Sequence, residues 1–93
     1  MERNDIETQL AEFIINELGM DLKYIDLKRD DISLFSPEIG LEARELIIIF
    51  FESQKKFGVL FTEGDILNNR FDYFQNIVDC IYKKLVNGHN END

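Results

Sequence analysis

Apolar residues recur every three or four positions in four parts of the chain, the spacing that places them on one face of an α-helix. The pattern predicts helices over residues 6–18, 41–56, 62–67 and 71–86. Asn4 or Asp5 would cap the first helix and Gly19 would end it. Asn69 and Asp72 would form a capping box for the last helix. The predicted fold class is therefore all-α, with a short third helix.

A long loop, from Met20 to Ser36, separates the first two predicted helices. Its apolar residues are too numerous for a free linker: Leu22, Ile25, Leu27, Ile32, Leu34 and Phe35. We therefore expect the loop to pack against the helices, with a short helical turn as one option. The alternation from Tyr24 to Lys28 would also suit a strand, for which the chain offers no evident partner strand.

The second predicted helix contains six consecutive apolar residues, from Leu46 to Phe51. Because each residue turns an α-helix by about 100°, this run goes all the way round the helix. A helix in a small domain buries only about half of its circumference. We assign one stripe to the core: Leu46, Ile49, Phe50, Ser53 and Phe57. Ile47, Ile48 and Phe51 then remain at least partly exposed as a candidate partner surface, unless the 20–36 loop folds over them.

Composition narrows the classes of partner. The 93 residues suit one domain, since 44% are hydrophobic, and we expect it over residues 1–86, followed by a disordered polar tail over residues 87–93. The formal net charge of -9 argues against nucleic-acid binding, which requires clustered Lys and Arg. An acidic chain instead favours basic protein partners.

Candidate catalytic chemistry is sparse. The chain has one cysteine, Cys80, and one histidine, His89, which lies in the polar tail. We therefore expect no disulfide, no thiol–imidazole site and no metal cluster. Glu42 and Glu45 could suggest a carboxylate pair, but no base, metal ligand or Gly-rich loop accompanies them, so we expect them to be solvated. The protein is predicted not to be an enzyme.

The sequence also bears on location. Residues 1–5 hold no apolar signal region. The longest apolar run is far shorter than the about 20 residues that span a membrane. Together with the single cysteine, these features predict a cytoplasmic protein with no membrane association.

The centre of the chain resembles acyl carrier proteins. The string Ser33-Leu34-Phe35 … Ile39-Gly40-Leu41-Glu42-Ala43-Arg44-Glu45-Leu46 is similar to the family's Ser-Leu-Phe … Leu-Gly-Leu-Asp-Ser-Leu. Leu18-Gly19-Met20 resembles the Leu-Gly-Val that closes the family's first helix, and Lys56-Phe57-Gly58-Val59 resembles the Glu-Phe-Gly-Ile that closes its second. The resemblance covers residues 6–86 and implies a four-helix bundle with a long loop between helices 1 and 2 and a short helix 3.

By this resemblance, Ala43 occupies the position of the family's serine, which carries 4'-phosphopantetheine. Counting back fourteen residues from Phe57 reaches the same position. A methyl group cannot form a phosphodiester, so no 4'-phosphopantetheine is expected. Ser36, seven residues upstream and next to Pro37, is the alternative site of modification.

The resemblance further implies that the second helix is a docking surface for partner enzymes. The family's helix is acidic, whereas here Arg44 replaces a usual Leu and Ile48 replaces a usual Glu. Residues 36–43 also resemble acyl-carrier-related proteins of bacterial peptide maturation systems. The expectation is a docking or scaffold module that contacts a peptide-modifying or biosynthetic enzyme. The contacting residues would be Arg44, Ile47, Ile48 and Phe51.

Two alternatives remain open. One is a functional acyl or peptidyl carrier modified at Ser36. The other is a self-associating module that forms a weak homodimer through the second helix.

Overall fold

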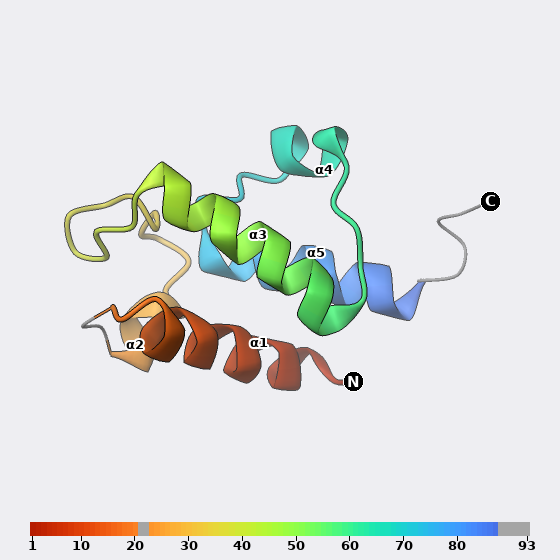
Figure 1. The fold of residues 1–93 in the computed structure, drawn as a ribbon, viewed down its shortest axis with the longest axis horizontal. Helices are drawn as coiled ribbons and strands as arrows, with labels where there is room; N and C mark the ends of the chain where they lie inside the picture. The colour runs from red at the N-terminus through yellow and green to blue at the C-terminus, as the bar shows by residue number, and fades with distance from the viewer. Residues whose placement is uncertain (21–22, 88–93) are drawn as a thin grey trace.

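The computed structural model describes residues 1–20 and 23–87, and these residues form helices and loops without strands (Figure 1). Residues 88–93 of the predicted tail, including His89, lie outside the described residues. The elements are α1 (Arg3–Glu12), the π-helical turn η1 (Phe13–Glu17), α2 (Tyr24–Leu27), α3 (Ala43–Phe57), α4 (Glu63–Asn68) and α5 (Phe74–Val86). The predicted all-α fold class is confirmed. In place of the strand considered for residues 24–28, the chain forms the single turn of α2.

The central element is α5, against which both α1 and α3 pack. Four of its side chains are fully buried: Phe74, Ile77, Val78 and Ile81. The core also contains Ile6, Leu10 and Ala11 of α1, Ile14 of η1, and Leu46, Ile49 and Phe57 of α3. Each of these helices places apolar residues three or four positions apart toward the core, as the periodicity predicted.

The loop before α3 is fixed to the segment before α5. Ser33 Oγ donates a hydrogen bond to Asp72 Oδ2 at 2.8 Å, and the Leu34 amide donates to the Asp72 carbonyl. Leu34 also accepts a backbone hydrogen bond from Leu41 at 3.0 Å. Within the loop from Met20 to Ser36, Leu27 and Leu34 are buried and Ile32 packs against the core, so the prediction that this loop packs against the helices is confirmed. Phe35 is instead 45% exposed, and Leu22 lies outside the described residues.

Two predicted helix starts are corrected. The first helix begins at Arg3, where Glu2 is the capping residue and its amide donates to Asp5 Oδ2 at 3.1 Å. The last helix begins at Phe74 instead of residue 71. The predicted capping box of Asn69 and Asp72 does not form, because the Asp72 carboxylate instead accepts hydrogen bonds from Ser33 and Arg70.

A buried carboxylate links α1 to α5. The Glu7 side chain is only 8% exposed, and its oxygens lie 3.2 Å from Lys28 Nζ and 3.5 Å from Arg3 Nη1. Gln75 on α5 donates to Glu7 Oε2 at 3.0 Å and to the Lys28 carbonyl at 2.8 Å. Arg3 also reaches α5, with its Nε 2.7 Å from Asp79 Oδ1.

The network sets the ionisation of Glu7. Burial alone would raise the pKa of Glu7, but the hydrogen bonds from Gln75 and Lys28, together with the charges of Lys28 and Arg3, lower this pKa below its ordinary value. The native state therefore favours the ionised form more than the unfolded chain does. Its stabilising effect is present above the ordinary Glu pKa of about 4.5 and is lost as the pH falls through the lower native pKa.

We therefore expect the Glu7→Gln variant to be less stable than the wild type by about 2 kcal/mol at pH 7, because it loses charge-assisted hydrogen bonds. The difference should shrink as the pH falls from 4.5 through the lower native pKa, because the Glu7 carboxylate of the unfolded wild type is protonated first and that of the native state afterwards. Urea titrations between pH 7 and pH 3 measure this, with Glu12→Gln on the exposed face of α1 as the control. Parallel pH profiles for wild type and Glu7→Gln would contradict the assignment.

Candidate functional site

The start of α3 places Ala43 at an exposed helix opening. Glu42 caps the helix in an extended conformation, and its amide donates to Glu45 Oε1 at 2.8 Å, which completes a capping box. Ala43 is therefore the first residue of α3 and is exposed. This position suits a group attached at a helix N-terminus, but the side chain present has no atom that could bear one.

One side of α3 is committed to the core. Leu46, Ile49, Ser53 and Phe57 are buried, as the stripe predicted. Phe50 is half-buried and packs edge-on against two other rings, with centroid distances of 5.9 Å to Phe61 and 5.2 Å to Phe71. The three phenylalanine rings join α3 to the segments on either side of α4.

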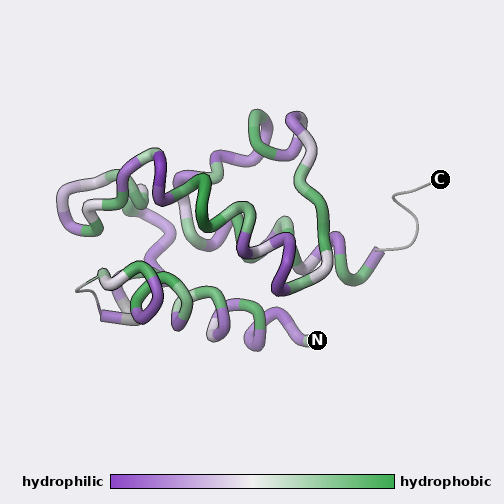
Figure 2. The backbone as a smooth tube through the Cα atoms, in the orientation of Figure 1, coloured by the Kyte–Doolittle hydropathy of each residue, from purple (hydrophilic) through white to green (hydrophobic). Residues whose placement is uncertain are grey.

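The opposite side of α3 is exposed and apolar. Ile47 is 52% exposed, Ile48 is 42% exposed and Phe51 is 61% exposed. We call these three residues the α3 patch. Their predicted exposure is confirmed, and the alternative that the preceding loop covers them is wrong. Figure 2 shows the middle of α3 as an unbroken hydrophobic stretch. An unbroken stretch goes all the way round the helix, and one buried face cannot accommodate all of its side chains.

Arg44 lies on the same side of α3 as the patch. The positions 44, 47, 48 and 51 fall within about 100° of the helix circumference. Arg44 is exposed and its Nε lies 3.3 Å from Glu42 Oε1. The structure thus brings together the four residues that the sequence proposed for partner contact.

The sequence analysis did not identify the exposed apolar residues of α4. None of the six described residues of this helix is buried. Ile66 and Leu67 are exposed, and so is Leu60 in the preceding loop. The signal was the adjacent pair Ile66-Leu67 in a helix too short to bury both.

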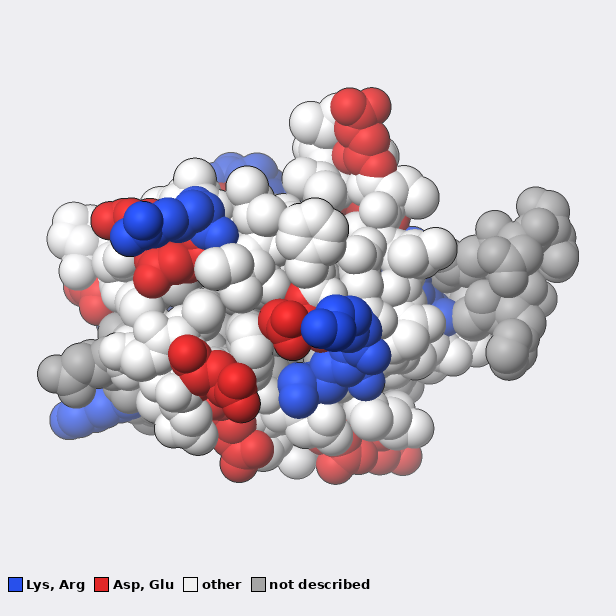
Figure 3. Space-filling view, viewed as in Figure 1, with Lys and Arg blue, Asp and Glu red and all other residues white. Residues whose placement is uncertain are grey.

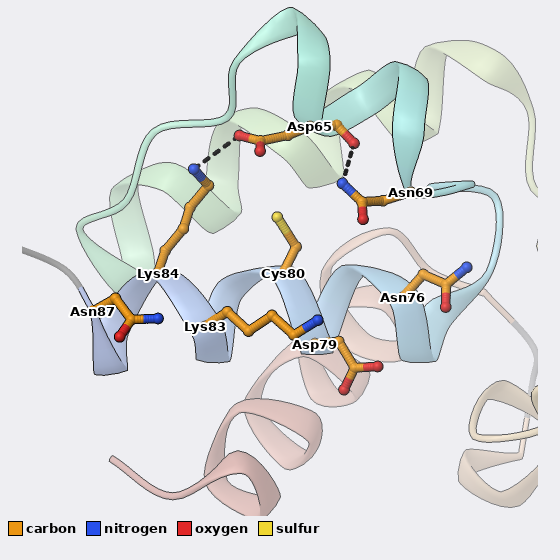
Figure 4. Close-up of a pocket in the computed structure, with 8 residues that line it drawn as sticks. All are labelled: Asp65, Asn69, Asn76, Asp79, Cys80, Lys83, Lys84 and Asn87. Atoms are coloured by element: carbon orange, nitrogen blue, oxygen red, sulfur yellow. Dashed lines mark hydrogen bonds and ion pairs between the residues drawn. The ribbon is translucent and has the colours of Figure 1, made fainter. Parts of the chain in front are cut away.

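Polar contacts hold α4 in place. The Thr62 amide donates to Asp65 Oδ2 at 2.7 Å, and Lys84 Nζ on α5 lies 2.8 Å from the same carboxylate (Figure 4). Burial alone would raise the pKa of Asp65, but the hydrogen bonds from Lys84 and Thr62 lower it below its ordinary value. The Lys84 side chain is only 10% exposed, so this ion pair is well shielded from water.

A cavity of about 380 Å³ lies between α4 and α5. It is lined by Asp65, Asn69, Asn76, Asp79, Cys80, Lys83, Lys84 and Asn87. Its carboxylates pair with Lys84 and Arg3, and these pairs hold the helices together. Among the described residues, no three His, Cys, Asp or Glu side chains are grouped so that they could hold a metal ion. We assign this cavity a structural role.

Ser36, the alternative site of modification, sits in a turn in which the amides of Ile39 and Gly40 donate to its carbonyl. Its hydroxyl oxygen is buried and has no hydrogen-bond partner among the described residues. A transferase could not reach this oxygen without rearranging the turn.

Comparisons of the chain with protein-family models, with curated proteins and with solved structures found no match. Within the described part of the chain, every helix is too short or too polar to cross a membrane. The candidate site therefore depends on the geometry of α3.

Phe50→Ala should lower the free energy of unfolding several times as much as Phe51→Ala. Phe50 packs against two rings, so its truncation should cost about 2–4 kcal/mol. Phe51 is mostly exposed, so its truncation should cost less than about 1 kcal/mol. Urea titrations followed by circular dichroism compare the two variants, and equal destabilisation would show that both rings belong to the core.

Proposed function

We propose that the chain is an acyl-carrier-like docking module that lacks the phosphopantetheine-bearing serine and binds a partner enzyme of a peptide maturation or biosynthetic pathway in the cytoplasm. The observation that carries the proposal is the α3 patch, three adjacent large apolar side chains exposed on a helix whose opposite face is firmly packed. Contiguous exposed apolar surface of this kind marks interaction sites more often than scattered apolar residues do.

The order of elements supports the acyl-carrier-like part of the proposal. A long helix, a packed loop, a second long helix, a short helix and a last long helix follow one another, as the resemblance implies. Ala43 is the first residue of α3, the place at which the family's serine opens its second helix. Ala43 is thus exposed at the start of the helix.

The carrier alternative has less support. Ala43 offers no oxygen nucleophile, and the Ser36 hydroxyl is buried. A catalytic role for the chain itself also has little support, because both carboxylates of the α4–α5 cavity are ion-paired, Asp65 with Lys84 and Asp79 with Arg3 of α1.

Site-specific crosslinking tests docking at the α3 patch. Replacing Phe51 with a photoreactive benzoylphenylalanine should give, in the source cells, a discrete adduct with one other protein. The same photoreactive residue at Lys56, one helical position from Lys55 and on the side of α3 that faces α1, should not give this adduct. Identical adducts at both positions, or none at residue 51, would contradict the proposal, and an adduct between two copies of the chain would favour self-association.

The protein should stay unmodified when incubated with coenzyme A and a broad-specificity phosphopantetheinyl transferase, as judged by intact-protein mass spectrometry. An adduct of one prosthetic arm on any residue would exclude a non-carrier role. We expect little modification of Ala43→Ser as well, because Arg44 and Ile48 alter the usual docking face. Efficient modification of that variant would show that the rest of a carrier site is intact.

A further inference from the structure

Two cations bracket the α3 patch. Arg44 and Lys55 are eleven residues apart, which places them about 16 Å apart along the helix axis. Both fall on the outward side of α3 that carries Ile47, Ile48 and Phe51. Arg44 precedes these residues by three, four and seven positions, and Lys55 follows them by eight, seven and four. Figure 3 shows largely uncharged surface over the middle of α3, with basic and acidic groups side by side over each of its ends.

The acidic residues of α3 occupy a different side of the helix. Glu45 and Glu52 each follow an outward-facing residue by one position, a turn of about 100° toward α1. Lys56 lies on this side too, where it lines a hollow with Glu12 and Glu17 of the first helix. The outward side therefore carries Arg44 at one end and Lys55 at the other, with apolar side chains between them, and each cation is paired with an exposed or half-exposed carboxylate beside it.

The ion pairs that Arg44 and Lys55 now make within the chain are weak enough for a partner's carboxylates to replace. Arg44 Nε lies 3.3 Å from Glu42 Oε1, and Lys55 Nζ lies 3.5 Å from Glu52 Oε2, with both cationic side chains more than 70% exposed. Exposed ion pairs of this kind contribute little. Carboxylates that arrive with an apolar partner would bind the same cations where water is excluded, which strengthens the attraction.

We infer that the α3 patch binds an amphipathic helix of another protein whose apolar face is flanked by Asp or Glu about three turns apart. This inference rests on the proposed docking function and names the chemistry of the partner. The patch covers about one turn of α3, between two cations about three turns apart, and a second helix can pack along such a row of side chains. The placement of Arg44 and Lys55 on the outward side thus favours an acidic partner, although the net charge of -9 would by itself favour a basic one.

A second copy of the chain does not fit the same surface. In an antiparallel pair of α3 helices centred on the patch, Arg44 of each copy would face Lys55 of the other. In a parallel pair, each cation would face its own equivalent. Both arrangements place like charges opposite one another beside a dehydrated apolar contact, which is unfavourable.

A displayed library of helical peptides provides the test. The peptides share a fixed Leu/Ile/Phe face and are randomised at the positions that flank it, and binders to the wild type are counter-selected against Phe51→Ala. We expect Asp and Glu to be enriched at the flanks. The doubly substituted Arg44→Glu, Lys55→Glu protein should instead enrich Lys and Arg. In fluorescence anisotropy, the best acidic peptide should bind the wild type at least tenfold more tightly than its Lys-substituted version.

Lys56→Glu is the matched control, because it makes the same charge change one position from Lys55 but on the side facing α1. Its affinity for the acidic peptide should stay within twofold of wild type. Phe51-dependent peptides without an acidic preference would overturn the inference and leave the docking function standing. A library that yields no Phe51-dependent peptide would overturn both, and dimerisation abolished by Phe51→Ala in sedimentation experiments would replace the acidic partner with a second copy.

Discussion

The burial of α5 between α1 and α3 is the constraint on which the rest of the structure depends. Four fully buried side chains on α5 require apolar faces from both neighbouring helices, and α3 supplies one such face. A helix can present only part of its circumference to one neighbour. The continuous apolar run of α3 therefore cannot be satisfied within this domain, and Ile47, Ile48 and Phe51 remain in contact with water. The exposed patch follows directly from how α5 is covered.

Polar contacts fix α1, the loop before α3 and α4 around this core. Glu7 joins α1, the end of α2 and α5 through Arg3, Lys28 and Gln75, and the Ser33–Asp72 contact fixes the loop before α3. By contrast, α4 has no buried residue among its six and depends on the Asp65–Lys84 pair and the neighbouring phenylalanine rings. The α3 patch thus lies on a helix whose opposite side is held by buried apolar contacts, whereas α4 is held by polar contacts and by the rings that flank it.

The sequence predicts the long helices and the division of α3 into a core side and an exposed side, because both follow from apolar periodicity. It did not predict that α5 begins at Phe74, since Asp72 is occupied by Ser33, a residue 39 positions away. The start of α1 was missed because glutamate is an uncommon cap and Glu2 acts together with Asp5. The turn of α2 was one of two options that the local pattern left open, and packing against α1 decides between them. The exposure of Ile66 and Leu67 could have been predicted from their adjacency in a helix too short to bury both.

The features of α3 form a consistent set when considered together. A carrier needs a nucleophile at the helix start and a surface suited to its modifying enzyme. This chain has a methyl group at the first position and, on the adjoining surface, Arg44 and Lys55 around an apolar centre. An acidic amphipathic partner of α3 would account for both the cationic and the apolar character of that surface. Its affinity would depend on exposed side chains that contribute little to the stability of the fold.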